Sequence, residues 1–357
     1  MNRRVLSTLL CFAVIAGLLL CYNASEPSVS ARPIGKTIAI PTPLGLPRVP
    51  IPADNSPTAE TVELGRQLYF DPQLSSDGTV SCSSCHSPAF GMADSKPLSE
   101  GVAKKLGARN SPTVLNAAYY TKEFWDGRAR SLEQQVEFPI QNPVEMAHTL
   151  RGVERKLSAD PGYVAEFQQA FGPGPITMHR VENALASFER TMLSGNSPFD
   201  RWYYGHDESA VSDSTKRGFE VFRNPKLGNC VTCHQVNEHY ALFTDNQFHN
   251  IGVGATEENI ADPGRYVVTH RESDLGAFKT PSLRNVAVTA PYFHDGSRKT
   301  LKDTVDFYVG GGNSNPHLDK EVHSLNFLTG QQRADLVSFM ESLTGETPAA
   351  STSSVWK

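Results

Sequence analysis

Apolar residues recur at helical spacing in three separate stretches of the chain, residues 58–70, 177–192 and 330–343. The first stretch, "TAETVELGRQLYF", also has the acidic first turn that is typical of a helix start. The inward-facing positions of the other two are Val181, Leu185 and Phe188, and then Leu336, Phe339, Met340 and Leu343. Alternating strand patterns are few and short. The pattern therefore predicts a mainly α protein with long loops.

The first residues have the pattern of an export signal. Arg3 and Arg4 precede an apolar run over residues 5–21, and Val29-Ser30-Ala31 offers small residues for cleavage. Residues 1–31 are therefore predicted to be a signal peptide, and the protein is predicted to be periplasmic. The alternative is an uncleaved N-terminal membrane anchor, because the run just reaches spanning length.

Prolines dominate residues 32–57, which predicts an extended linker rather than a core segment. Two folded domains are then expected, over residues 58–195 and 196–345, followed by a disordered tail over 346–357. The chain has 357 residues, which is enough for two modest domains. A formal net charge of −5 excludes a broad basic surface for nucleic acid.

A duplication relates the two predicted domains. Residues 65–72 ("GRQLYFDP") and 218–225 ("GFEVFRNP") have apolar pairs in register, and both lead to the same five-residue motif. That motif is C-x-x-C-H, "CSSCH" at residues 82–86 and "CVTCH" at 230–234. Each domain is therefore predicted to consist of a helix that leads into a haem-attachment loop.

In C-x-x-C-H the two thiols bond to the haem vinyl groups and the histidine binds the iron. Cys82 and Cys85 would attach one haem c, with His86 on its iron. Cys230 and Cys233 would attach the other, with His234 on its iron. Zinc sites or redox disulfides are the alternatives. However, zinc would not require a histidine directly after both cysteine pairs.

The sixth ligand of each iron decides the chemistry, because an electron carrier fills that position and a peroxide-reacting haem leaves it open. No histidine lies between His86 and His148, so the first iron is either open or bound by Met92 or Met146. For the second iron, Met340 is expected in the core. Its remaining candidates are the histidines at 239, 249, 270, 294, 317 and 323, and tyrosines such as Tyr308.

From about residue 58 to 345 the chain resembles the bacterial di-haem cytochrome c peroxidase/MauG family. Besides the two C-x-x-C-H sites, the resemblance rests on "RNSPTVLNAAYY" (109–120), "FWDGRARSLEQQ" (124–135), "NPVEM" (142–146) and "SLRNVAVTAPYFHDGS" (282–297). It implies a peroxidatic N-terminal haem and an electron-relay C-terminal haem. It also implies that Trp125 bridges the haems, that Glu145 is the distal acid–base group, and that Gln135 and Pro139 lie in the distal pocket.

The resemblance further implies one calcium ion, held by the Asn110 side chain and by the carbonyls of Thr289 and Pro291. Two positions depart from the usual pattern. Val102 stands where a distal histidine is expected, and Tyr308 stands where a methionine usually binds the second iron. Both departures are similar to MauG. They imply an open first haem and a Tyr308-ligated second haem.

The function expected from this resemblance is hydrogen peroxide reduction, with a high-valent state spread over both haems through Trp125. The electron donor would be a small c-type cytochrome, a cupredoxin or a protein substrate, and a homodimer is one candidate assembly. A conventional cytochrome c peroxidase that detoxifies peroxide is the main alternative. A pure electron-transfer cytochrome is a second alternative, and it would require two six-coordinate irons.

Overall fold

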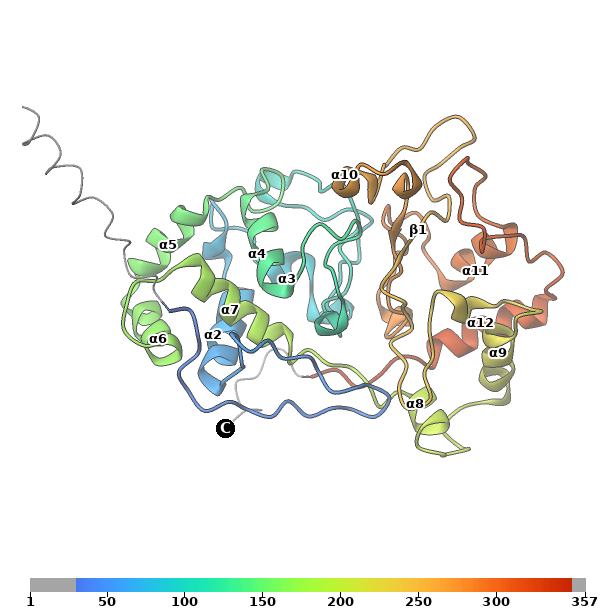
Figure 1. Ribbon diagram of the computed structural model, residues 1–357, viewed down its shortest axis with the longest axis horizontal. Coiled ribbons are helices and arrows are strands. Elements are labelled where there is room, and N and C mark those ends of the chain that lie inside the picture. The colour runs from blue at the N-terminus through green and yellow to red at the C-terminus, as the bar shows by residue number, and fades with distance from the viewer. Residues whose placement is uncertain (1–29, 349–357) are drawn as a thin grey trace, which may run out of the picture. The chain divides into compact units, whose positions relative to one another are not determined.

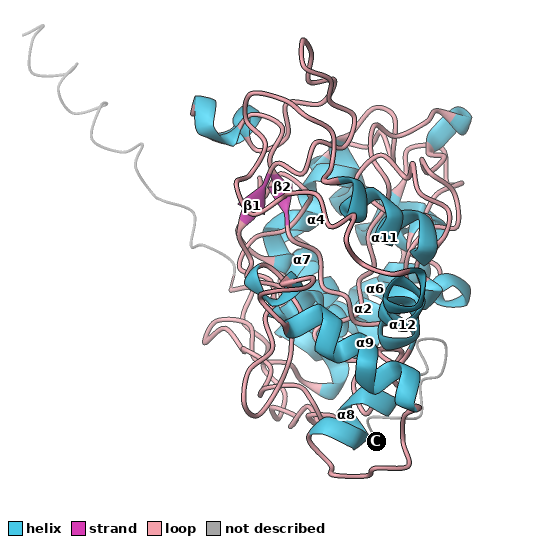
Figure 2. Cartoon of the chain, turned by 90° about the vertical axis from the view of Figure 1, so that its right-hand side faces the viewer, coloured by secondary structure: helices cyan, strands magenta, loops and turns pink. Residues whose placement is uncertain are grey.

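The computed structural model describes residues 30–348, so the predicted signal or anchor (1–31) and the predicted tail (346–357) lie almost entirely outside the described residues. Among those described, no helix is both long and apolar enough to cross a membrane. The fold is mainly helical, as predicted, and its strands β1 (Phe248–His249) and β2 (Phe278–Lys279) form a two-stranded antiparallel sheet (Figure 2).

Helices of the first half gather around one core and those of the second half around another (Figure 1). The first half contains α2 (Ala59–Phe70), α3 (Cys82–Cys85), α4 (Leu132–Gln141), α5 (Leu150–Ser158), α6 (Pro161–Phe171) and α7 (Met178–Glu189). The second half contains α8 (Pro198–Tyr203), α9 (Asp213–Arg223), α10 (Tyr266–Thr269), α11 (Leu301–Gly310) and α12 (Gly330–Glu341). The three stretches with helical spacing became α2, α7 and α12, and every inward position named for them is buried.

The duplication extends to the packing of the helices. Gly65 on α2 lies against the carbonyl of Ala184 on α7, where an added Cβ would come within 1.9 Å of the oxygen. Gly218 on α9 lies against the carbonyl of Asp335 on α12, again with 1.9 Å for an added Cβ. Only glycine allows a helix to approach a backbone carbonyl this closely. Since both halves have a glycine at this position, the same close helix pair occurs in each of them.

A second duplicated segment follows, which the motif comparison did not include. Asn116 and Asn285 each have positive φ and begin a short 3₁₀ turn. After these turns, α4 and α11 begin at corresponding positions, with Ser131 and Thr300 as their N-caps. The alignment runs without insertion, so Pro139 of α4 corresponds to Tyr308 of α11.

The proline-rich segment over residues 32–57 contains no helix, as predicted. The prediction that it stays out of the core was wrong, because Leu46 packs in a small buried cluster with Tyr119 and Leu193. Its backbone also binds the second half, since Arg284 donates to the Gly45 carbonyl at 2.6 Å. A proline-rich chain cannot supply many N–H donors, but its carbonyls remain available as acceptors.

Candidate functional site: a haem cavity and a second attachment loop

The two cysteine pairs lie on short helical turns that present both thiols from one loop. Cys82 and Cys85 form the ends of α3, which Ser81 caps, and Cys230 begins the 3₁₀ turn Cys230–Thr232. All four thiols are free of disulfide bonds. This arrangement fits attachment of haem through both thiols of each pair.

Both histidines of the motifs are oriented by a backbone carbonyl. His86 Nδ1 donates to the Pro112 carbonyl at 2.9 Å, and His234 Nδ1 donates to the Phe243 carbonyl at 2.9 Å. Burial lowers the pKa of both imidazoles, which keeps them neutral. With Nδ1 protonated, Nε2 of each ring carries the free lone pair that a haem iron would take.

A cavity of about 790 Å³ opens beside the first motif. Cys82, Cys85 and His86 form part of its wall, and apolar side chains form much of the rest, including Leu74, Val136, Ile140 and Leu185. His86 is reachable from this space although protein surrounds it. The wall therefore has the thiols, the axial nitrogen and the apolar lining that a covalently attached haem requires.

The predicted distal residues line this same cavity. Gln135 and Pro139 are one turn apart on α4, and Glu145 follows in the loop after α4. Asn142 donates to Glu145 Oε1 at 2.6 Å. Burial raises the pKa of Glu145, and the bond from Asn142 partly opposes that rise. The structure thus brings together three predicted side chains that are separate from the haem motif in sequence.

Val102, at the position of the expected histidine, is buried, and its N–H donates to the Glu145 carbonyl at 2.8 Å. Met92 and Met146 are both buried in the first core, and Met146 also lines the cavity.

Trp125 lies where the two halves meet. Its Nε1 donates to the Asn110 carbonyl at 2.8 Å, and its own carbonyl accepts from the Lys279 N–H of the second half. Arg109 strengthens this junction with ion pairs to Asp126 at 2.6 Å and to Asp262 at 2.7 Å. Trp125 is therefore held rigidly on the side of the first cavity that faces the second half.

Tyr308 lies on α11 near the second thiol pair. Burial raises the pKa of its phenol, and Cys233 and Cys230 raise it further. Met340 belongs to the second core, as expected. The location of Tyr308 is therefore consistent with a ligand to the second iron.

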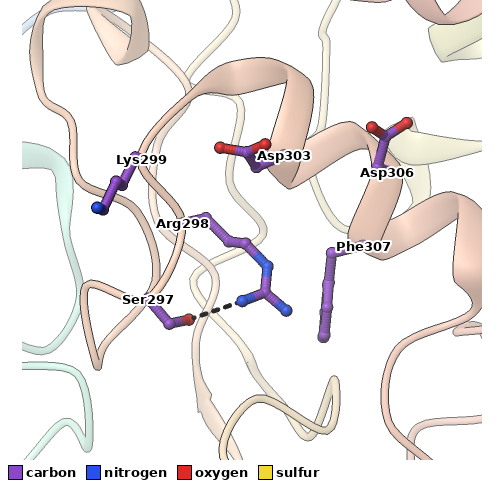
Figure 3. Close-up of a pocket in the computed structure, with 6 residues that line it drawn as sticks. All are labelled: Ser297, Arg298, Lys299, Asp303, Asp306 and Phe307. Carbon is purple, nitrogen blue, oxygen red and sulfur yellow. Dashed lines mark hydrogen bonds between the residues drawn. The ribbon is translucent and has the colours of Figure 1, made fainter.

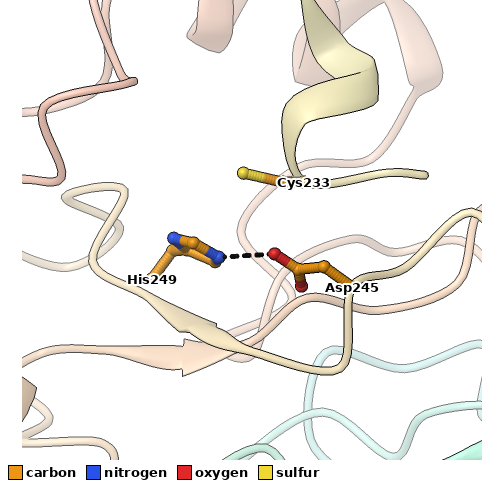
Figure 4. Close-up of side chains that lie close together, drawn as sticks. All are labelled: Cys233, Asp245 and His249. Carbon is orange, nitrogen blue, oxygen red and sulfur yellow. Dashed lines mark hydrogen bonds and ion pairs between the residues drawn. The ribbon is translucent and has the colours of Figure 1, made fainter.

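Next to Cys233, His249 forms ion pairs with Asp245 at 2.9 Å and with Asp319 at 2.6 Å. The bond from Asp245, then the contact with the Cys233 thiol and the bond from Asp319, raise the pKa of His249 to about 11. Candidate ligand atoms of Cys233, Asp245 and His249 lie within 4.8 Å of one another (Figure 4). Once Cys233 forms a thioether with haem, its sulfur is a neutral and weaker ligand, so we interpret the group as a set of ion pairs beside the attachment loop.

Between residues 30 and 348, no hydrogen bond reaches Oδ1 of Asn110 or the carbonyls of Thr289 and Pro291, the predicted calcium ligands. Asn110 donates through Nδ2 to the carbonyls of Lys96 and Pro97, which leaves its Oδ1 directed elsewhere. Its N–H also bonds to the His294 carbonyl, close in the chain to Thr289 and Pro291. An oxygen-only ligand set of this type suits calcium.

Glu123, Glu189 and Asp262 also line the cavity, and none of them was predicted from the sequence. His294, a candidate ligand of the second iron in the sequence, lines the cavity beside the first motif, and it corresponds to Trp125 in the second duplicated segment. It stacks on Phe278 with ring centroids 3.6 Å apart, and burial lowers its pKa to about 4.

A separate surface hollow beside α11 is lined by charges of both signs, among them Arg298, Lys299 and Asp303 (Figure 3).

Comparison with known proteins places these features in a family. A family model described as di-haem cytochrome c peroxidase matches residues 59–208, and one described as cytochrome c matches residues 215–344. The methylamine utilization protein MauG of Methylorubrum extorquens is 43% identical over 305 residues, which cover 85% of this chain and 83% of MauG. The cytochrome-c peroxidase IdrP1 of Denitromonas iodatirespirans is 38% identical over 336 residues, covering 86% and 87% of the two chains.

A crystal structure of a MauG-like protein associated with microbial copper homeostasis has a TM-score of 0.78 at 28% identity, covering 88% of this chain and 97% of that one. These likenesses support an oxidoreductase with two covalently attached haems. The chain therefore belongs to the di-haem cytochrome c peroxidase family that includes MauG.

Proposed function

We propose that this protein reduces hydrogen peroxide in the cavity beside His86 and takes the electrons from an external donor through the second haem. One observation carries the proposal. A single cavity joins His86 to Glu145, Gln135 and Pro139, with Trp125 on the side facing the second half. Such a space combines room for a small substrate, an acid–base group and a route for electrons.

A haem bound in this cavity would supply an iron atom that binds peroxide and exchanges electrons with it. On the proximal side, His86 would bind the iron through Nε2, with its ring fixed by the Pro112 carbonyl. On the other side, Pro139 offers no side-chain donor atom, and Val102 replaces the expected histidine. Peroxide would therefore meet no histidine ligand from this loop.

Glu145 would move the proton. As a carboxylate it accepts a proton from one peroxide oxygen, and it then returns that proton to the other oxygen, which leaves as water. Its raised pKa makes it a stronger base than an exposed glutamate. Asn142 holds the carboxyl in place.

In the second half, His234 and Tyr308 would hold the relay haem. Burial keeps the Tyr308 phenol protonated in the absence of metal, so ligation requires the charge of the iron to displace its proton. A tyrosinate ligand lowers the reduction potential of the iron that it binds. The second haem would then accept electrons poorly from an ordinary small cytochrome, which favours a protein substrate as the donor. The alternative is a peroxide-detoxifying enzyme with a c-type cytochrome or cupredoxin as donor.

We further propose that Asn110, Thr289 and Pro291 hold calcium near the junction of the halves, and that the protein acts in the periplasm. The calcium proposal is supported by the oxygens of these residues, which lack hydrogen bonds, and the periplasmic one by the leader sequence.

The test is Glu145→Gln in the haem-loaded protein. We expect the second-order reaction with peroxide, followed by stopped-flow absorption, to slow by about 10²–10⁴-fold. Glu137→Gln is the matched control, because Glu137 lies on α4 but not in the cavity wall. An unchanged rate in Glu145→Gln would remove this residue from the acid–base role.

A further inference from the structure

Two carboxyl groups besides Glu145 line the cavity, and the proposed function does not use them. Glu189 is the last residue of α7, and Glu123 precedes the turn that carries Trp125. Each is only 7% exposed. Carboxyl groups rarely lie this deep unless a partner compensates for the lost hydration.

Glu189 lacks such a partner. No hydrogen bond or ion pair joins its carboxyl to any residue between 30 and 348. Nearby Arg190 forms an ion pair with Glu133 at 2.7 Å, and Lys279 forms one with Glu123 at 4.0 Å. The Glu189 carboxyl therefore lines the cavity without a hydrogen bond or an ion pair, and Arg190 is the positive charge near it.

The groups around Glu189 come from every neighbouring element. Glu123 and Arg190 are adjacent, Glu133 lies on α4, Tyr69 lies on α2 and Cys82 lies on α3. Burial and, to a smaller extent, the negative charge of Glu123 raise the pKa of Glu189 to about 8 against the opposing effect of Arg190. Near neutral pH the side chain thus exchanges readily between its acid and its carboxylate.

An electron that enters a haem in this cavity adds a negative charge beside a buried carboxyl. In a medium of low polarity the two negative charges repel strongly, so the carboxyl is driven to take up a proton. When the electron leaves, the proton can leave with it. Peroxide reduction consumes two electrons and two protons, so a site that takes up one proton with one electron would serve it.

We propose that Glu189 is the group that takes up a proton when the first haem is reduced by one electron. The electron comes from the external donor, the proton comes from solvent, and reoxidation releases both. Glu123 acts on this uptake as a negative neighbour. The inference rests on the proposed attachment of haem beside His86, but not on the role of Glu145.

The test is a redox titration of the haem-loaded protein at a series of pH values, with both haems followed by their absorption. For one proton per electron, each tenfold change in proton concentration shifts the midpoint potential by about 59 mV. We expect the first haem's potential to fall as pH rises around 8, while the second haem serves as an internal reference. Glu189→Gln should make the first haem's potential independent of pH.

Glu182→Gln is the matched control. Glu182 is also on α7, is 4% exposed and has a pKa that burial raises to about 8, but it is not part of the cavity wall. This variant should retain the pH dependence. A second variant, Glu123→Gln, should retain the slope but move it to lower pH, because it removes a negative neighbour.

A first-haem potential that is flat in the unchanged protein, or equally pH-dependent in Glu189→Gln, would overturn the proposal. Loss of the slope in Glu182→Gln as well would also overturn it, since the effect would then be general to α7. If Glu145→Gln leaves peroxide reduction unchanged while the Glu189-dependent slope is present, the proposed function fails and this inference stands.

Discussion

Helices α4 and α11 are corresponding elements in the two halves of the molecule, and they differ at the position that we propose sets the ligand of each iron. Each helix follows a duplicated turn and begins at an N-cap residue with a hydroxyl group. Leu132 of α4 and Leu301 of α11 are both buried. Near the end of the helix, α4 has Pro139 and α11 has Tyr308. Proline offers no ligand atom, whereas tyrosine can offer a phenolate.

Under the proposed function, one duplicated scaffold would hold a reactive haem in the first half and an electron-relay haem in the second. The attachment loops, the proximal histidines and their carbonyl partners are matched. The difference lies in a few side chains, with Glu145 and Pro139 on one side and Tyr308 on the other. Four predictions test this contrast.

The largest effect is expected from Pro139→Tyr, which gives the first half the phenol of the second. A tyrosine on α4 would face the cavity and compete with peroxide for the iron. We expect a loss of peroxide reactivity at least as great as that of Glu145→Gln, measured by stopped-flow absorption. A fully reactive variant would mean that this position does not face the iron, and the contrast would fail.

The next largest effect is expected in the rate of the peroxide reaction as the pH is lowered. Glu145 must be ionised to accept a proton, and burial raises its pKa above the ordinary value of 4.5. The reaction should therefore weaken as pH falls through a value higher than 4.5, and this limb should disappear in Glu145→Gln. A limb that persists in the variant would assign it to another group.

The glycine contacts are expected to be equally sensitive in both halves. Gly65→Val and Gly218→Val each push a side chain into a backbone carbonyl of the partner helix. Each should lower the free energy of unfolding by about 1–3 kcal/mol, or more where the helices cannot separate. Denaturant unfolding of the haem-loaded protein measures this, and a large effect in only one half would show that the duplicated packing is not equivalent.

The smallest effect should come from the helix caps. Thr300 forms a reciprocal capping box with Asp303, whereas the Ser131 hydroxyl accepts only the Gln134 N–H. Ser131→Ala should cost about 0.5–2 kcal/mol, and Thr300→Ala combined with Asp303→Ala, which removes both bonds of the box, should cost more. Hydrogen exchange of α11 and α4 would report the local loss, and the reverse order would contradict the capping argument.

Local patterns made much of this structure predictable. The C-x-x-C-H motifs, the helical spacing of α2, α7 and α12 and the first duplication needed only neighbouring residues. The family resemblance supplied Glu145, Gln135 and Pro139, and the structure brings all three to one cavity.

What could not be predicted depends on contacts between distant parts of the chain. Glu189 lies at the end of α7, a helix that is buried almost along its whole length, and its place in the cavity wall follows from the fold and not from the local sequence. Asp262 reaches the first cavity from the second half through its ion pair with Arg109. Leu46 is in a proline-rich segment whose composition predicts an exposed linker, yet a shared cluster buries it.

The most direct test of the contrast between the halves is an electron paramagnetic resonance spectrum of the fully oxidised, haem-loaded protein, repeated on Tyr308→Met. We predict one high-spin and one low-spin ferric haem, with only the low-spin signal altered by the substitution. Two low-spin haems that do not respond to Tyr308→Met would contradict the account, because both irons would then carry ligands other than those proposed here.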